Sequence, residues 1–175
     1  MTTTLLGKGA FPETHDLSVG MLGMHGVAWA SMAVDQADLF IGLGMRFDDR
    51  VTGRLEDFAP RAKIIHIDIE RSSINKNVAV DIALVGDATT ILDSLLKTWK
   101  KRKCEMRKEQ IRQWWDKIDG WRAKDCLKYS NSSANIKPQF ANERLHAHTK
   151  DRDVYCLLYT SDDADDTPCV DLGGR

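Results

Sequence analysis

The sequence predicts an α/β fold, a mainly parallel, Rossmann-like sheet flanked by helices. Three short runs rich in aliphatic and β-branched residues have the length and composition of buried strands, at 39–43, 63–69 and 81–87. Stretches with apolar residues at helical spacing, at 25–39 and 87–99, stand between or beside these runs. Strands that alternate with helices indicate βαβ units, and such units pair their strands in parallel.

The elements of the first 99 residues follow in a regular order. A glycine-rich segment at 20–26, GMLGMHG, leads into the first helical stretch. The strand at 39–43, LFIGL, then runs into a turn at Gly44 and a dense polar cluster. After the strands at 63–69 and 81–87, Asp87 stands where an N-cap residue belongs, directly before the last helical stretch.

The chain changes character after residue 99. Residues 100–128 are densely charged, yet apolar residues recur at three- and four-residue spacing and predict an amphipathic helix with one buried stripe: Ile111, Trp114, Trp115, Ile118 and Trp121. Gly120 is expected to bend or end this helix. Residues 129–137 have the composition of a loop, and Pro138 is placed in the first turn of a further helix. A strand is conceivable at 153–159, but no core element is expected beyond it.

Bulk composition excludes several classes of function. The 175 residues carry a net charge of −1, which gives no support to a nucleic-acid or membrane-surface partner. No apolar run approaches the roughly 18 residues of a membrane span, and the first residues lack a signal-peptide layout, so we expect a cytoplasmic protein. The four cysteines form no C-x-x-C pair and the five histidines are scattered, so no metal site is expected.

The glycines of the segment at 20–26 have two interpretations. Gly20, Gly23 and Gly26 lack a Cβ and so allow a flat ligand to approach the backbone closely, next to the N–H groups of the following helix. Alternatively, they are turn residues that precede a helix. Glycine spacing alone does not decide between these interpretations.

The charged cluster after the strand at 39–43 is the more specific feature. Arg46, Asp48, Asp49 and Arg50 follow the carboxyl end of a strand, where phosphate-bearing ligands bind in open α/β sheets. Guanidinium groups suit a pyrophosphate or the polar edge of a flavin, and carboxylates suit ribose hydroxyls. A self-satisfied surface cluster of ion pairs is the alternative. Because only G-x-G is present, the dinucleotide fingerprint of a standard Rossmann fold is absent.

Two further carboxylates fall at strand ends. Asp68 stands where an acidic residue contacts ribose or adenine in nucleotide-binding sheets, and Asp87 holds the same place one strand later. A turn or N-cap role is the alternative for each. Asp48 and Asp49 are adjacent, so in an extended chain they point to opposite sides and form no acid–base couple. With no recognisable catalytic motif, the residues alone predict a nucleotide-type binding module without chemistry of its own.

Five strings resemble one family when taken in chain order: TTTLLGKGAFPETH, LSVGMLGMHG, ADLFIGLGMRFDDRVTG, KIIHIDIE and INKNVAVDIALVGD. Over residues 1 to about 155 the chain is similar to the acetolactate synthase (acetohydroxyacid synthase) large catalytic subunit, at its central domain. GMLGMHG together with RFDDRVTG is the most specific part, because other thiamine diphosphate enzymes share the fold but not both strings.

The resemblance implies FAD as the cofactor of this domain, with thiamine diphosphate and Mg²⁺ bound by other parts of the enzyme. It implies a transferase that decarboxylates pyruvate and condenses the product with a second 2-keto acid, pyruvate or 2-ketobutyrate, in branched-chain amino-acid biosynthesis. The implied partners are further copies, in a homodimer or homotetramer, and a regulatory small subunit. The implied compartment is the bacterial cytoplasm, or a plastid or mitochondrion in a eukaryote.

Carried over position by position, the resemblance implies a set of FAD contacts: Thr4, Leu5, Gly23, Met24, His25, Gly26, Gly44, Arg46, Asp48, Arg50, Val51, Asp68, Ile69 and Asp87. Met24, Asp49 and Arg50 also match positions at the mouth of the substrate channel, where herbicides bind in this family. No catalytic residue and no metal ligand is expected in this chain.

The resemblance also divides the chain. Residues 1–99 match the FAD-binding domain, truncated on its N-terminal side, and 100–135 match the helix and linker that follow. Residues 136–156 match the start of the thiamine-diphosphate domain, and 157–175 have no counterpart and are expected to be non-native. The chain alone is expected to be inactive. The alternatives are a non-catalytic module that binds NAD or an adenine nucleotide, and a chimeric, truncated read that does not fold alone.

Overall fold

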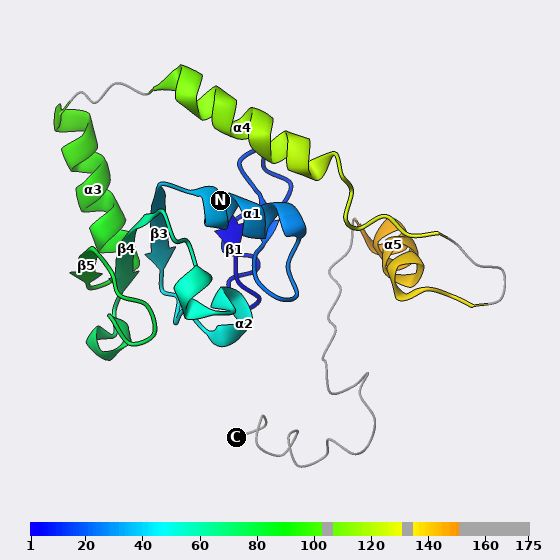
Figure 1. Ribbon diagram of the computed structural model, residues 1–175, viewed down its shortest axis with the longest axis horizontal. Helices are drawn as coiled ribbons and strands as arrows, with labels where there is room; N and C mark the ends of the chain where they lie inside the picture. The colour runs from blue at the N-terminus through cyan, green and yellow to red at the C-terminus, as the bar shows by residue number, and fades with distance from the viewer. Residues whose placement is uncertain (103–106, 131–134, 151–175) are drawn as a thin grey trace, which may run out of the picture. The chain divides into compact units, whose positions relative to one another are not determined.

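A computed structural model describes residues 1–102, 107–130 and 135–150 of the chain. The chain divides into two compact units, Met1–Leu127 and Lys128–Arg175. The first unit carries the strands and helices that position the candidate site (Figure 1). Its elements are β1 (Thr2–Thr3), β2 (Gly20–Met21), α1 (Ala28–Gln36), β3 (Leu39–Leu43), α2 (Asp49–Thr52), η1 (Leu55–Asp57), β4 (Lys63–Asp68), η2 (Arg71–Ser73), β5 (Ile82–Val85), α3 (Ala88–Arg102) and α4 (Lys108–Arg122).

Two parallel sheets form in this unit. The larger has the order β3-β4-β5, with Leu39 opposite Lys63 and Ile65 opposite Ile82. The smaller pairs β1 with β2, and Thr2 lies opposite Gly20. Parallel pairing throughout, with helices between the strands, confirms the α/β class and the mainly parallel sheet predicted from the sequence.

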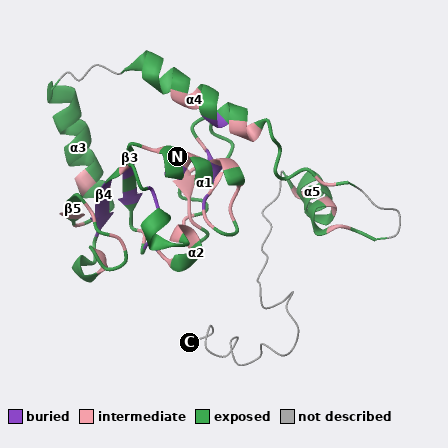
Figure 2. Ribbon diagram, in the orientation of Figure 1, coloured by how far each residue is buried: buried purple, intermediate pink, exposed green. Residues whose placement is uncertain are grey.

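One face of the larger sheet forms the core. Side chains alternate between the two faces of a strand, so Phe40 of β3 and Ile64 and His66 of β4 share the buried face. Phe47 and Phe58 cover that face, and their rings meet each other and Phe40 at centroid distances of 5.4–6.0 Å. Figure 2 shows this burial concentrated in β3 and β4.

The helix α4 packs on α1 and completes the core. Ile118 is buried, and Trp114, Trp115 and Trp121 pack against the same cluster, as the predicted stripe requires. The prediction that Ile111 belongs to the buried stripe is wrong, because Ile111 lies at the start of α4 and is exposed.

The predicted helix boundaries shift in this region. α3 runs to Arg102, beyond the predicted end at 99, and its last turn holds the basic residues that favour a helix C-terminus. Gly120 neither ends nor interrupts α4, because the buried Ile118 before it and the partly buried Trp121 after it hold the helix on the core.

The second unit is described in part. Its helix α5 (Pro138–Thr149) begins at Pro138, as predicted. Proline lacks a backbone N–H, but an N–H in the first turn has no helical partner, so no hydrogen bond is lost. The Tyr129 hydroxyl donates to the Glu143 carboxylate at 2.6 Å, and this bond raises the pKa of Tyr129. The strand considered at 153–159 and the tail at 157–175 lie outside the described residues, and the segment boundaries at 99, 135 and 156 stay predictions. Within the described ranges, no helix is both long and apolar enough to cross a membrane.

Candidate functional site

The carboxyl ends of the three strands meet at one edge of the larger sheet. The Gly44 N–H, after β3, donates to the carbonyl of Ile67 in β4 at 2.8 Å. The Gly86 N–H, after β5, donates to the carbonyl of Asp68 at 2.9 Å. These bonds tie both neighbouring loops to the end of β4, so Gly44, Asp68 and Asp87 lie at a common edge, as the parallel topology predicts.

The charged cluster forms the turn from β3 into α2. Asp48 is the N-cap of α2, and its carboxylate accepts from the Arg50 N–H at 3.4 Å. The Asp49 carboxylate accepts from the same N–H at 2.9 Å. The expectation that Asp48 and Asp49 point to opposite sides assumed an extended chain. Asp48 is extended, but Asp49 begins α2, and both carboxylates accept from the same N–H, so the two side chains lie together.

The environment of Asp48 favours its ionised form. The pKa of Asp48 lies below its ordinary value for three reasons: a hydrogen bond with the Asp49 carboxyl group, a hydrogen bond from the Arg50 N–H, and the nearby Arg46 guanidinium. Arg46 forms an ion pair with Asp48 and remains largely exposed. The cluster is thus partly self-satisfied, as the alternative interpretation held, while the Arg46 guanidinium stays accessible to a ligand.

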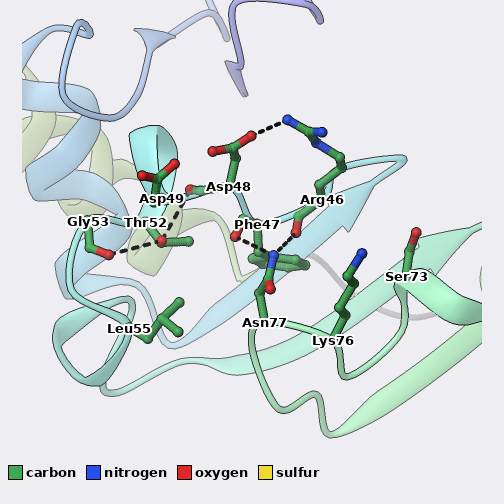
Figure 3. A pocket seen from close by; sticks show the side chains of 10 residues that line it. All are labelled: Arg46, Phe47, Asp48, Asp49, Thr52, Gly53, Leu55, Ser73, Lys76 and Asn77. Atoms are coloured by element: carbon green, nitrogen blue, oxygen red, sulfur yellow. Dashed lines mark hydrogen bonds and ion pairs between the residues drawn. The ribbon is translucent and has the colours of Figure 1, made fainter.

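A cleft of about 340 Å³, here called the first cleft, opens beside this turn (Figure 3). Arg46, Asp48 and Asp49 line one side, and the η2–β5 loop supplies Lys76 and Asn77 on the other. Lys76 forms no ion pair with any part of the chain that the structure describes. The full lining is Arg46, Phe47, Asp48, Asp49, Thr52, Gly53, Leu55, Ser73, Lys76 and Asn77.

The glycine-rich segment contacts the charged segment directly. The Met24 N–H donates to the Arg50 carbonyl at 2.9 Å, and the Arg50 Nη1 lies 3.8 Å from the Met24 sulfur. A Cβ at Gly23 would lie 2.5 Å from the Arg50 carbonyl oxygen, and one at Gly26 would collide with the Met21 carbonyl. Close approach of protein backbone therefore accounts for both glycines, which supports the turn interpretation at these positions.

A second cleft, of about 270 Å³, lies on the other side of the end of α2. It shares Thr52 and Gly53 with the first cleft but is more apolar, with Leu22, Met24 and Val51 in its wall. Its full lining is Leu22, Gly23, Met24, Ser31, Val34, Asp35, Val51, Thr52, Gly53, Asp57, Phe58 and Ala59.

The carboxylates at the strand ends both serve local structure. Asp68 is buried; its Oδ1 accepts from the Glu70 N–H at 2.8 Å, and its Oδ2 lies 3.6 Å from His66 Nε2. Asp87 accepts from the N–H and hydroxyl of Thr90 at 2.9 and 3.1 Å, which lowers the pKa of Asp87 and caps α3. The turn and N-cap roles considered for these two residues are therefore present.

The structure brings most of the predicted residues into two groups. Gly23, Met24, Arg50 and Val51 meet at the junction of the two segments, and Gly44, Arg46, Asp48, Asp68 and Asp87 belong to the sheet edge and its loops. Thr4 follows β1, where it accepts from the Gly7 N–H, and Leu5, His25 and Ile69 are exposed and line neither cleft.

Sequence reasoning did not single out several residues at this site. Asn77, Lys76 and Ser73 line the first cleft from a loop 20 or more residues beyond the charged cluster, and only the β3–β4–β5 topology brings them there. His66 is another such residue: it is fully buried, and neither of its ring nitrogens has a hydrogen-bond partner among the residues that the structure describes. No group of three or more metal-ligating side chains occurs in the described part of the chain.

The family model for the thiamine pyrophosphate enzyme central domain matches residues 1–95, the part that holds both sheets and both clefts. The chain belongs to this family. The acetolactate synthase isozyme 3 large subunit of Escherichia coli is 45% identical over 147 residues, which cover 84% of this chain. The acetolactate synthase large subunits of Haemophilus influenzae and Porphyra purpurea are 43% and 46% identical, over 86% and 79% of this chain.

These relatives confirm the resemblance to acetolactate synthase large subunits. The matched stretch is 26% of the Escherichia coli protein and 23% of the Porphyra purpurea protein. The chain thus spans about a quarter of the length of the curated relatives it matches, at their thiamine pyrophosphate enzyme central domain.

Proposed function

We propose that this chain is the FAD-binding central domain of an acetolactate synthase large subunit. The observation that carries the proposal is the junction between the two most specific segments. The Met24–Arg50 hydrogen bond joins them at the end of α2, with a polar cleft on one side and an apolar cleft on the other. The relatives that share the sequence are acetolactate synthase large subunits.

The side chains around the two clefts suit the chemistry of FAD. Arg46 and Lys76 offer cationic donors to a diphosphate, and the Asp48 carboxylate is an acceptor for hydroxyl groups. The second cleft offers Leu22, Met24 and Val51 to a flat apolar ring. Asp68 fits a ribose contact less well, since its carboxylate is buried and already bonded within the chain.

In the proposed role these residues bind and orient FAD, which takes no part in net redox chemistry. Met24, Asp49 and Arg50 line the mouth of the substrate channel. The contact between Met24 and Arg50 supports a shared location for those two, while Asp49 faces the first cleft.

For the whole protein we propose acetolactate synthesis, the activity in the names of its relatives, by the decarboxylation of pyruvate and condensation with a second 2-keto acid that the family resemblance implies. In this proposal thiamine diphosphate and Mg²⁺ are bound by residues of the large subunit other than those of this chain, and the regulatory small subunit is a separate partner. This chain alone, supplied with pyruvate, thiamine diphosphate, Mg²⁺ and FAD, is expected to form no acetolactate. Colorimetric detection of acetolactate tests this, and product formation above a heat-denatured control would overturn it.

Flavin binding is the direct test. When FAD is titrated into the purified chain, the flavin fluorescence should be quenched and the melting temperature of the protein should rise. NAD should leave the melting temperature unchanged. A shift with NAD and none with FAD would favour the NAD or adenine-nucleotide module instead. A chain with no cooperative melt would support the chimeric read that does not fold alone.

A matched pair of arginine variants locates the site. Arg46→Ala removes a guanidinium from the first cleft and should weaken FAD binding about tenfold, the loss expected for one charge-assisted hydrogen bond. Arg54→Ala is the control, because Arg54 is exposed and, within residues 1–102, 107–130 and 135–150, pairs only with its neighbours Glu56 and Asp57. Equal affinities for the two variants would place FAD elsewhere.

A further inference from the structure

The side chain of Asn77 holds the loop that carries Arg46 and Asp48. Its Nδ2 donates to the Arg46 carbonyl at 2.9 Å and to the Phe47 carbonyl at 3.1 Å. Figure 3 shows this amide between the two carbonyls, reaching across from the η2–β5 loop. The contact joins segments 30 residues apart and is formed by side chain to backbone, so it depends on residue type at position 77.

The loop needs such a contact because its backbone is strained. Phe47 has a φ of 52°, the left-handed region that bulky residues rarely occupy. Its ring is buried and packs edge-on against His66 at 4.9 Å and against Phe58 at 5.9 Å. The ring thus anchors the loop from the core side, and the Asn77 amide anchors the carbonyls from the cleft side.

The conformation at Phe47 sets the positions of its two neighbours. Arg46 precedes the strained residue and Asp48 follows it as the N-cap of α2, and the two side chains form an ion pair at the first cleft. If the Arg46 and Phe47 carbonyls lose their donor, they are free to bond to solvent instead. The preference of Phe47 for a negative φ then favours a different turn. The ion pair would then no longer face the cleft in a fixed arrangement.

We propose that Asn77 is a positioning residue, whose amide fixes the Arg46–Asp48 loop in the conformation that presents Arg46 and Asp48 to the ligand of the first cleft. The inference rests on the proposed FAD site for its ligand, but the loop conformation it describes is independent of any ligand. Asn77 acts through the loop backbone, so its substitution changes affinity through Arg46 and Asp48.

Trypsin cleavage tests the loop without FAD. Asn77→Ala and Asn77→Asp both remove the donor, and Asp nearly keeps the shape of the side chain. Each should speed cleavage of the Arg46–Phe47 bond about tenfold, since two backbone acceptors lose their partner. Cleavage after Arg54, in the same molecule, is the internal control and should not change. An unchanged rate at Arg46 would overturn the inference.

FAD affinity tests the positioning role. Measured well below the melting temperature, Asn77→Ala should weaken FAD binding about tenfold, whereas Ile118→Ala, a core change that lines neither cleft, should leave the affinity unchanged. In the Arg46→Ala background, Asn77→Ala should cause a smaller loss than it does in the wild type, because part of its effect passes through Arg46. Full additivity of the two changes would overturn the positioning role.

The two proposals fail in different ways. If the wild-type chain binds no FAD while Asn77→Ala still exposes the Arg46–Phe47 bond, the proposed function is overturned and the loop contact stands. If the wild-type chain binds FAD and Asn77→Ala binds it equally well, the inference is overturned and the proposed function stands.

Discussion

At the scale of single residues, the site depends on the close approach of the Gly23–Met24 backbone to the backbone of Arg50 and Val51. Gly23 has a φ of +96°, and its Cα lies against the first turn of α2. The Met24–Arg50 hydrogen bond forms only because that approach is open. The same absence of a side chain that first suggested room for a ligand therefore makes room for Arg50 and Val51.

Gly23→Ala is expected to disrupt this junction. The added Cβ would lie 2.5 Å from the Arg50 oxygen and 2.9 Å from the Val51 Cα, both rigid backbone atoms, on top of about 1–2 kcal/mol for the left-handed conformation. Gly9→Ala is the matched control, since Gly9 has a φ of +88° and a Cβ there would have no atom of the described part of the chain within 4 Å. Urea unfolding should show a loss for Gly23→Ala well beyond that for Gly9→Ala, and similar losses would contradict the packing argument.

Sequence reasoning at this scale found the residues but not always their partners. The cap at Asp87 follows from a short spacing, and the structure has it; an ion-pair cluster among residues 46–50 was the alternative to ligand binding, and the structure has the Arg46–Asp48 pair. Asn77 and His66 were not predictable in this way, because their surroundings are set by strand register and by a loop 30 residues away. The expectation that Asp48 and Asp49 point to opposite sides applies to an extended chain, and it does not hold here because a helix begins at Asp49.

At the scale of elements, α3 shows a cap whose strength depends on pH. The Asp87 carboxylate accepts from the Thr90 N–H and hydroxyl, which lowers the pKa of Asp87 below its ordinary 3.8. A lowered pKa means that the folded state binds the proton less tightly than the unfolded state. The stabilisation is therefore complete above pH 3.8 and is lost as the pH falls through the lower, folded-state pKa.

Thermal melts of Asp87→Ala and Asp87→Asn, followed by circular dichroism at pH 7 and near pH 3, test this cap. Asp87→Ala should melt below the wild type at pH 7, and the difference should shrink toward pH 3. Asp87→Asn keeps an uncharged capping oxygen, so its difference from Asp87→Ala should not depend on pH. A wild-type advantage over Asp87→Ala that is constant with pH would show that the ionised carboxylate contributes nothing.

The helix α4 tests whether the aromatic stripe belongs to the core of the first unit. Ile118 is 1% exposed among the core residues, and Ile111, on the same helix, is 45% exposed. Ile118→Ala should lower the free energy of unfolding by about 2–5 kcal/mol, whereas Ile111→Ala should change it by less than about 1 kcal/mol. Denaturant melts give both values, and comparable losses would mean that α4 does not bury Ile118.

At the scale of the whole molecule, the other face of the larger sheet is apolar and only partly covered: Ile67 is fully buried there and α3 contacts β4, but the row of isoleucines beside Ile67 is exposed at both of its ends. Ile41, Ile65 and Ile82 lie side by side across β3, β4 and β5, and Ile41 and Ile82 are each 50% exposed. Leu39 and Leu43 extend the same row along β3, which is an edge strand among the described elements. An exposed apolar face beside a strand edge is a site of association.

We therefore expect the isolated chain to self-associate through this face, and a single charge to reduce it. Ile41→Lys places a cation at the centre of the row, where Ile41 is already half exposed, so stability should change little. Sedimentation velocity over a range of concentrations should show oligomers for the wild type and mainly monomer for Ile41→Lys. Ile111→Lys, an equal change at a comparably exposed position on α4, should behave as the wild type does. If both lysine variants dissolve the oligomers equally, added net charge rather than loss of this face explains the effect.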